Sequence, residues 1–299
     1  MPNARFVLFE DRGVLAITGP DRRSFLQGLV SNDVDKVTPT QARYAALLTA
    51  QGKYLHDFTM AELDEAILID AEAARLADLK RRLSIYRLRA KATLEERPDL
   101  AVAAVFGDDA LTALDLSAEP GAARAFAAGI VFVDPRLAAL GARCILARDK
   151  AESALTAAGF TQTEFEVYDR LRLGLGIPDG SRDLQLEKSI LLEAGFDELN
   201  GVDWNKGCYI GQELTARTKY RGLIKRRLVP VAIDGASPPP GTVVLADGRD
   251  VGEMRSSHDG RGLALLRIDV LQDRRLTAGD AVVVPSLPQW MQIDSGDAS

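Results

Sequence analysis

The octapeptide KGCYIGQE occupies residues 206–213 and is the most informative stretch of the chain. Its two glycines predict a tight backbone path, followed by a helix over residues 212–220. Cys208 then lies just ahead of a helix N-terminus, two residues after Lys206. Both a helix N-terminus and a nearby cation stabilise a thiolate, so Cys208 is a candidate nucleophile, iron ligand or oxidation site. The alternative is that Cys208 is a small buried hydrophobic residue.

The chain before and after the octapeptide indicates an α+β body and a terminal barrel. From about residue 44 to 178, apolar strands alternate with helices without regular βαβ spacing, which favours antiparallel sheets. After residue 227, short apolar strands alternate with turns such as Asp247-Gly248, which predicts a small β-barrel. We therefore expect an α+β region over residues 1–227, with two intertwined subdomains divided near residues 44–100. Residues 228–299 are expected to form the barrel and a short disordered tail.

The octapeptide resembles the signature of the YgfZ-type folate-binding proteins, which are relatives of the glycine-cleavage T-protein. Further blocks that are similar to this family cover most of the chain between residues 19 and 227. They are Gly19-Pro20-Asp21, Phe25-Leu26-Gln27-Gly28, Ser31-Asn32-Asp33-Val34, residues 47–53 with Asp57, residues 172–178 and residues 222–227. The resemblance implies a duplicated, T-protein-like folate-binding region and a C-terminal β-barrel, arranged around a funnel that holds a tetrahydrofolate-type ligand.

The resemblance also implies a function. The family is tied to the maturation of iron–sulfur proteins, especially four-iron enzymes, and to tRNA-modifying enzymes that depend on them. Its motif cysteine, which is Cys208 here, is functionally critical. The resemblance thus implies an accessory factor with two cofactors, tetrahydrofolate and a transient iron–sulfur cluster ligated by Cys208. Its expected partners are iron–sulfur assembly or client proteins.

Two other classes of function stay open. T-proteins are aminomethyltransferases that use tetrahydrofolate; they lack the motif cysteine and carry adjacent acids where this chain has His56-Asp57. Asp57 alone could orient a folate amine, so it is a catalytic candidate beside Cys208 and Lys206, and both an enzyme and an accessory factor stay open. The third class is a folate-binding scaffold without chemistry of its own.

A folate site needs an aromatic or apolar wall, polar partners for the pterin edge and cations for the glutamate tail. Family members place an aromatic residue where Tyr168 precedes the Gly176-Ile177-Pro178 block, and T-protein relatives place a pterin-binding acid in the region of Glu193. The full set of candidate folate contacts is Tyr168, Asn32, Asp33, Glu193, Tyr209, Gln212, Arg217 and Arg221. The alternatives are a core position for Tyr168 and ordinary turn chemistry for Asn32 and Asp33.

Composition restricts the class of protein. The 299 residues include 37 Lys and Arg against 43 Asp and Glu, and 46% are apolar, which is ordinary for a soluble globular protein. The chain has two cysteines, Cys208 and Cys144, and two histidines, which cannot hold a cluster without external ligands. We interpret Cys144 as structural. The N-terminus has no apolar signal region and no apolar run is long enough to span a membrane. We therefore expect a cytoplasmic protein with no membrane partner.

Two runs of cations contrast with the net charge of −6. Residues 80–91 and residues 217–227 each contain six Lys or Arg side chains, with Tyr86 in the first run and Tyr220 in the second. Such runs could attract a polyglutamylated folate, an acidic partner or RNA, or they are simply solvated faces. Direct nucleic-acid binding is not expected, because the chain is acidic overall and carries no known nucleic-acid-binding module.

Overall fold

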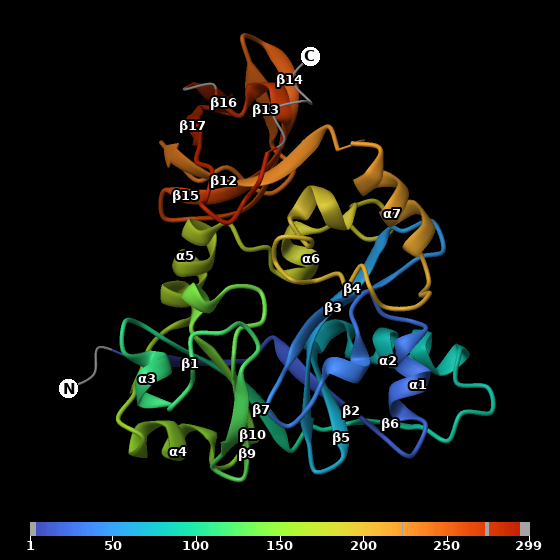
Figure 1. The fold of residues 1–299 in the computed structure, drawn as a ribbon. Helices are drawn as coiled ribbons and strands as arrows, with labels where there is room; N and C mark the ends of the chain where they lie inside the picture. Colours follow the sequence, from blue (N-terminus) through green and yellow to red (C-terminus); the bar gives the residue numbers. More distant parts are fainter. Residues whose placement is uncertain (1–3, 223, 273–274, 294–299) are drawn as a thin grey trace. The chain divides into compact units, whose positions relative to one another are not determined.

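The computed structural model describes residues 4–222, 224–272 and 275–293, which form two compact units (Figure 1). Unit 1 comprises Met1–Leu48, Leu55–Tyr168 and Asn200–Ile210, and unit 2 comprises Thr49–Tyr54, Asp169–Leu199 and Gly211–Ser299. The predicted disordered tail, residues 294–299, lies outside the described residues. The domain division expected at residue 227 stays a prediction. None of the helices in the described ranges is long and apolar enough to cross a membrane.

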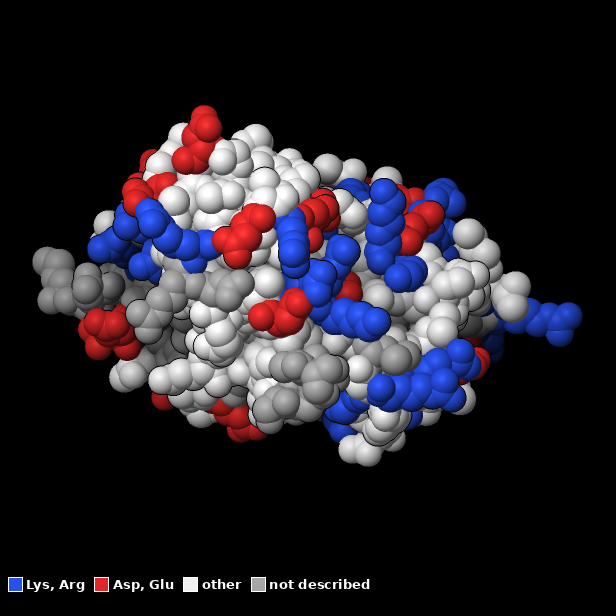
Figure 2. Space-filling view, turned by 90° about the horizontal axis from the view of Figure 1, so that it is seen from above, with Lys and Arg blue, Asp and Glu red and all other residues white. Residues whose placement is uncertain are grey.

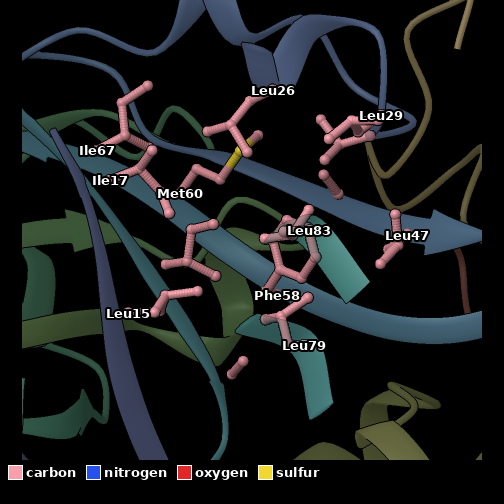
Figure 3. Packing of buried hydrophobic residues seen from close by; sticks show 14 of the residues in the cluster. Leu15, Ile17, Leu26, Leu29, Leu47, Phe58, Met60, Ile67, Leu79 and Leu83 are labelled. Atoms are coloured by element: carbon pink, nitrogen blue, oxygen red, sulfur yellow. The ribbon is translucent and has the colours of Figure 1, made fainter. Parts of the chain in front are cut away.

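A five-stranded sheet forms one half of unit 1. Its strand order is β3-β4-β5-β2-β6. The strands are β3 (Arg43–Leu48), β4 (Tyr54–Leu63), β5 (Ala66–Glu72), β2 (Arg12–Thr18) and β6 (Thr93–Glu96). Its apolar face packs against α1 (Arg22–Gln27) and α2 (Leu76–Ile85), and Leu26, Leu79 and Leu83 point from these helices into the cluster shown in Figure 3. The two-residue period of the strands places Phe58 and Met60 of β4 in this cluster.

A six-stranded mixed sheet forms the other half of unit 1. Its order is β11-β1-β7-β10-β9-β8, and β1 pairs parallel with β11 but antiparallel with β7. The strands are β11 (Thr161–Gln162), β1 (Arg5–Phe9), β7 (Leu100–Phe106), β10 (Ala142–Ala147), β9 (Gly129–Val133) and β8 (Ala123–Phe126). The sheet packs on a second apolar cluster to which α3 (Ala110–Ala113) and α4 (Ala151–Ala157) contribute. The helix α3 is a single short turn.

Buried ion pairs join the two sheets of unit 1. Arg143 on β10 donates to Asp70 on β5 at 2.7 Å and to Asp134 at 2.9 Å. Arg12 on β2 also pairs with Asp70, at 2.6 Å. Asp70 and Asp134 are at most 1% exposed, so their charges are stable there only because guanidinium groups surround them. Despite burial, Arg12 and Arg143 hold the pKa of the Asp70 carboxyl below its usual range, and Arg136 and Arg143 do the same for Asp134.

Unit 2 contains a closed six-stranded barrel. Its order is β12-β15-β14-β13-β16-β17. The strands are β12 (Arg226–Asp234), β15 (Arg261–Arg267), β14 (Arg249–His258), β13 (Val243–Ala246), β16 (Leu276–Ala278) and β17 (Ala281–Pro285). The predicted hairpin at Asp247-Gly248 joins β13 to β14, and both residues have positive φ, as a type I′ turn requires. The α+β class with antiparallel sheets and a terminal barrel is confirmed.

Candidate functional site

Cys208 lies in the segment Asn200–Ile210, here called the Cys208 loop, which returns to unit 1 from unit 2. The loop is hydrogen-bonded to residues 27–36, which begin at the last residue of α1 and include the turn after it. The Oγ of Ser31 donates to the carbonyl of Gly201 at 2.6 Å, and the Nδ2 of Asn32 donates to the carbonyl of Asn200 at 2.7 Å. The backbone N–H of Asp203 donates to the carbonyl of Ser31 at 3.0 Å. These bonds fix the loop before it reaches the cysteine.

Lys206 is the central anchor of the Cys208 loop. Its Nζ donates to the carbonyl oxygens of Gln27, Val30 and Asn32 at 2.8, 2.6 and 2.8 Å. An ammonium has three donors, so these three carbonyls use all of them. The side chain is 7% exposed, and burial lowers the pKa of Lys206 to about 8. Its observed contacts are those of a residue that holds the loop; activation of the Cys208 thiol by this lysine stays a prediction.

Cys208 itself is exposed, whereas the residues after it are anchored. Tyr209 is 7% exposed, and Ile210 packs against the cluster of the five-stranded sheet. The backbone N–H of Ile210 also donates to the carbonyl of Gly28 at 3.3 Å. The thiol is therefore presented to solvent between Lys206 and Ile210, two fixed points of the chain. The reading of Cys208 as a buried hydrophobic residue is wrong.

The second cysteine has the opposite environment. Cys144 lies on β10, is 0% exposed, and burial raises the pKa of its thiol to about 12. Its interpretation as a structural residue agrees with this placement. Within the part of the chain that the structure describes, no group of three or more His, Cys, Asp or Glu side chains could hold a metal ion. A cluster bound at Cys208 needs ligands from another molecule.

Asn32 and Asp33 have structural contacts in unit 1. The Nδ2 of Asn32 donates to the carbonyls of Tyr44 and Asn200, and its Oδ1 accepts the backbone N–H of Asp33. Asp33 caps the short helix at Val34–Lys36 and accepts a bond from Gln27 at 2.8 Å. Turn chemistry, which was the alternative to folate binding, accounts for both side chains.

Asp57 and His56 face opposite sides of β4. Asp57 is buried and accepts a 2.8 Å hydrogen bond from the hydroxyl of Tyr44. His56 faces α2, where its Nε2 lies 3.0 Å from the carboxylate of Asp78, and burial lowers its pKa to about 4. Because adjacent residues of a strand alternate in direction, the side chains of His56 and Asp57 do not form one site.

Tyr168 and Tyr209 are both buried in unit 1. Tyr168 lies on α5 (Phe165–Leu175) and packs edge-on against Phe9 and Phe106, with ring centroids 5.1 and 5.6 Å apart. Tyr209 has the ammonium of Lys206 5.2 Å from its ring centroid. Tyr168 thus occupies an aromatic cluster, as its core alternative required.

The remaining candidates belong to unit 2. Glu193 lies in the short helix Leu191–Ala194; burial raises the pKa of its carboxyl, although the nearby cations Lys53, Arg226 and Arg255 oppose this shift. Gln212 begins α7 (Gln212–Tyr220), as predicted. In this helix Arg217 pairs with Glu213 at 2.7 Å, and Arg221 follows the last turn.

Sequence reasoning missed Ser31 and Asp203, which anchor the Cys208 loop. Asp203 accepts the backbone N–H groups of Asn205 and Lys206 at 2.8 and 3.1 Å and pairs with Lys36 at 2.5 Å. An Asp three residues before the motif lysine is a local turn signal that could have been found. The bond from Ser31, 170 residues before Gly201, carries no such signal.

Comparison with known proteins places these features in a family. Residues 10–125 match the GCVT N-terminal domain, and residues 225–293 match the CAF17 C-terminal beta-barrel domain. The chain is 34% identical over 305 residues to the human protein named iron-sulfur cluster assembly factor IBA57, mitochondrial, covering 94% of this chain and 83% of the relative. The chain belongs to the IBA57 family of iron–sulfur cluster assembly factors. The mouse protein of that name is 33% identical over 311 residues, covering 94% of this chain and 84% of the relative.

A solved structure has the same fold as this member of the IBA57 family. The glycine cleavage system aminomethyltransferase T from Bartonella henselae matches with a TM-score of 0.78, covering 97% of this chain and 87% of that chain. Its sequence identity is 17%, so this likeness shows the fold alone. The resemblance to the YgfZ-type proteins was to a related family, and the family to which the chain belongs is that of IBA57. The cytoplasmic location expected from the sequence is wrong, because the IBA57 relatives are named mitochondrial.

Proposed function

We propose that this protein is a folate-binding accessory factor that assembles or repairs four-iron proteins, tRNA-modifying enzymes among them, through Cys208. The observation that carries the proposal is the exposed thiol on an anchored loop. Support also comes from the names of the IBA57 relatives, which are iron–sulfur cluster assembly factors.

The cluster is cargo in this proposal, and Cys208 supplies one of its ligands. Four-iron clusters are held by four thiolates, so the others come from an assembly partner, a client protein or a small thiol. In the transfer step the Cys208 thiol loses its proton to solvent and its sulfur replaces one ligand of an iron atom. The displaced ligand takes up a proton, and no oxidation or reduction is needed. An exposed thiol suits this exchange, because both proteins must reach the cluster.

A candidate residue fits tetrahydrofolate only if its polar atoms are not already used in hydrogen bonds within the protein. Asn32 and Asp33 do not fit, because their polar atoms are bonded within unit 1. Glu193 fits, because a half-buried carboxyl can bind the N–H groups of a pterin edge, and the cations near it suit a glutamate tail. Tetrahydrofolate, when bound, supplies a one-carbon acceptor. In this chain Glu193 would hold and orient it.

A cluster-assembly assay tests the role of Cys208. Purified protein, a cluster donor and an apo four-iron enzyme are mixed, and recovery of enzyme activity is followed. Cys208→Ala should reduce the recovery to that of a reaction without the protein, whereas Cys144→Ala, a control at a buried cysteine, should retain it. Equal recovery with Cys208→Ala would overturn the proposal.

Calorimetric titration with tetrahydrofolate tests the folate part separately. Glu193→Gln should weaken binding by about tenfold or more, because it removes a charged hydrogen-bond acceptor. Asp269→Asn is the control, since that side chain is 50% exposed and pairs with Arg267, which is not a candidate folate contact. Absence of binding by the wild-type protein would remove folate from the proposal. A glycine-cleavage assay with the lipoyl carrier would detect the aminomethyltransferase alternative.

A further inference from the structure

Residues 85–91, here called the α2–β6 tip, expose three large apolar side chains in four positions. Ile85 is 60% exposed, Tyr86 is 48% exposed and Leu88 is 89% exposed. In Figure 1 the tip is the teal loop that follows α2 and projects outward. These three neighbouring side chains leave a contiguous apolar surface in water, and contiguous exposed apolar surface is a feature of interaction sites.

The α2–β6 tip is an ordered element. Backbone hydrogen bonds of 3.0, 3.2 and 2.7 Å close successive turns from Tyr86 to Leu83, from Arg87 to Ser84 and from Ala90 to Arg87. At the end of the tip, the N–H of Lys91 donates to the carboxylate of Asp21 at 2.7 Å.

The apex of the tip is Leu88, which has a φ of +42°. A left-handed conformation is unfavourable for leucine, and glycine or asparagine would form this turn with less strain. The tip therefore holds an apolar side chain outward at a position where local stability favours a different residue.

Cations surround this apex. Arg87, Arg89 and Lys91 are all exposed, and the tip, IYRLRAK, contains no acidic residue. Arg81, one turn earlier on α2, is 61% exposed and pairs with Asp78. Figure 2 shows one face of the molecule, on which many Lys and Arg side chains lie beside Asp and Glu side chains. Residues 217–227 are also cationic and acid-free in sequence, but Arg217, Lys219 and Arg227 there pair with Glu213, Asp197 and Glu198.

Against the expectation from the sequence of no membrane partner, we propose that the α2–β6 tip docks on an anionic phospholipid surface. Leu88, Ile85 and Tyr86 would enter the boundary between headgroups and acyl chains, and the three cations would contact lipid phosphates. An anionic bilayer offers contacts to both kinds of side chain in the tip, the apolar ones and the cationic ones. RNA would pair with the cations but would gain nothing from Leu88 and Ile85, and the tip is a projection whose apolar apex needs a surface that can be penetrated.

Cosedimentation of the full chain with vesicles tests this proposal. We expect binding to phosphatidylcholine vesicles that contain phosphatidylglycerol, weaker binding to phosphatidylcholine alone, and loss of binding as salt is raised. The double variant Ile85→Ser with Leu88→Ser should lower the partition coefficient by about tenfold or more, because two apolar anchors are lost. Arg87→Gln with Arg89→Gln should lower it at low salt and flatten its salt dependence.

The controls are Leu287→Ser, at a side chain 37% exposed beyond the barrel strands, and Arg267→Gln, at an exposed cation paired with Asp269. Both should bind as the wild type does. All substituted side chains are exposed, and thermal unfolding confirms that each variant is folded. Failure of the wild type to bind anionic vesicles would overturn the proposal, as would equal binding by the tip variants. If vesicles do not bind but the tip variants impair cluster assembly, the tip docks on an acidic protein instead.

Discussion

The ammonium of Lys206 donates a 2.6 Å hydrogen bond to the carbonyl oxygen of Val30, 176 residues earlier in the chain. The same ammonium also donates to the carbonyls of Gln27 and Asn32. The lysine thus provides a hydrogen-bond donor for carbonyl oxygens at the end of α1 and in the turn after it, where helical hydrogen bonding stops. The motif lysine therefore fixes the position from which Cys208 is presented.

Lys206→Met should lower the free energy of unfolding by about 2–4 kcal/mol, because buried carbonyls lose a charged donor. Urea denaturation measures this change. Lys36→Met is the matched control: it also links residues 27–36 to the Cys208 loop, but through a half-exposed pair with Asp203. Such pairs contribute less than about 1 kcal/mol. Equal losses in the two variants would contradict the anchoring role of Lys206.

Alkylation should distinguish the two cysteines. In the native protein, iodoacetamide should modify Cys208 readily and leave Cys144 unmodified, because Cys144 is buried and its thiol pKa is about 12. Both should react in denaturant. Peptide mass spectrometry measures the two extents. If Cys144 were modified in the native protein as fast as Cys208, its thiol on β10 would be accessible to the reagent, which would contradict its burial.

Arg143→Met should destabilise the protein by about 3–5 kcal/mol, because it leaves the carboxylates of Asp70 and Asp134 with fewer partners inside unit 1. Arg97→Met, at a surface pair with Asp99, should change the unfolding free energy by less than about 1 kcal/mol. Thermal and urea unfolding provide the comparison. A small effect of Arg143→Met would mean that the sheets do not depend on this link.

His56 should make stability depend on pH. Its pKa is about 4 in the folded state against 6.5 for an ordinary histidine, so the unfolded chain binds more protons between these values. Stability should therefore fall as pH drops from about 6.5 to about 4, by about 3 kcal/mol from this group. His56→Gln should flatten that part of the profile, measured by urea unfolding at a series of pH values. An unchanged slope would contradict burial of the neutral imidazole.

Local patterns predicted much of the fold. The helix over residues 212–220 and the Asp247-Gly248 hairpin are found as expected, and the continuous apolar run of residues 100–106 forms β7. Each depends on neighbours in the sequence: helix formers after a glycine, a continuous apolar run, or two residues that tolerate positive φ. By contrast, the end of α1 at Gln27 involves a distant partner, because the carbonyls of Gln27 and Val30 accept hydrogen bonds from Lys206.

The site was harder to predict than the fold. The exposure of Cys208 and the engagement of Lys206 depend on contacts with residues far away in the chain, which no local pattern reports. Asn32 illustrates the same limit: its amide looks available in the sequence, yet its partners are Tyr44 and Asn200. His56 and Asp57 are adjacent in sequence, but strand geometry separates their side chains.

The most direct measurement is the activity of a four-iron enzyme in cells that lack the endogenous protein. The cells receive the wild-type chain, Cys208→Ala or Cys144→Ala, and immunoblotting confirms equal amounts of each. We predict that the wild type and Cys144→Ala restore activity and that Cys208→Ala does not. Restoration by Cys208→Ala would contradict the central claim that the exposed thiol performs the function.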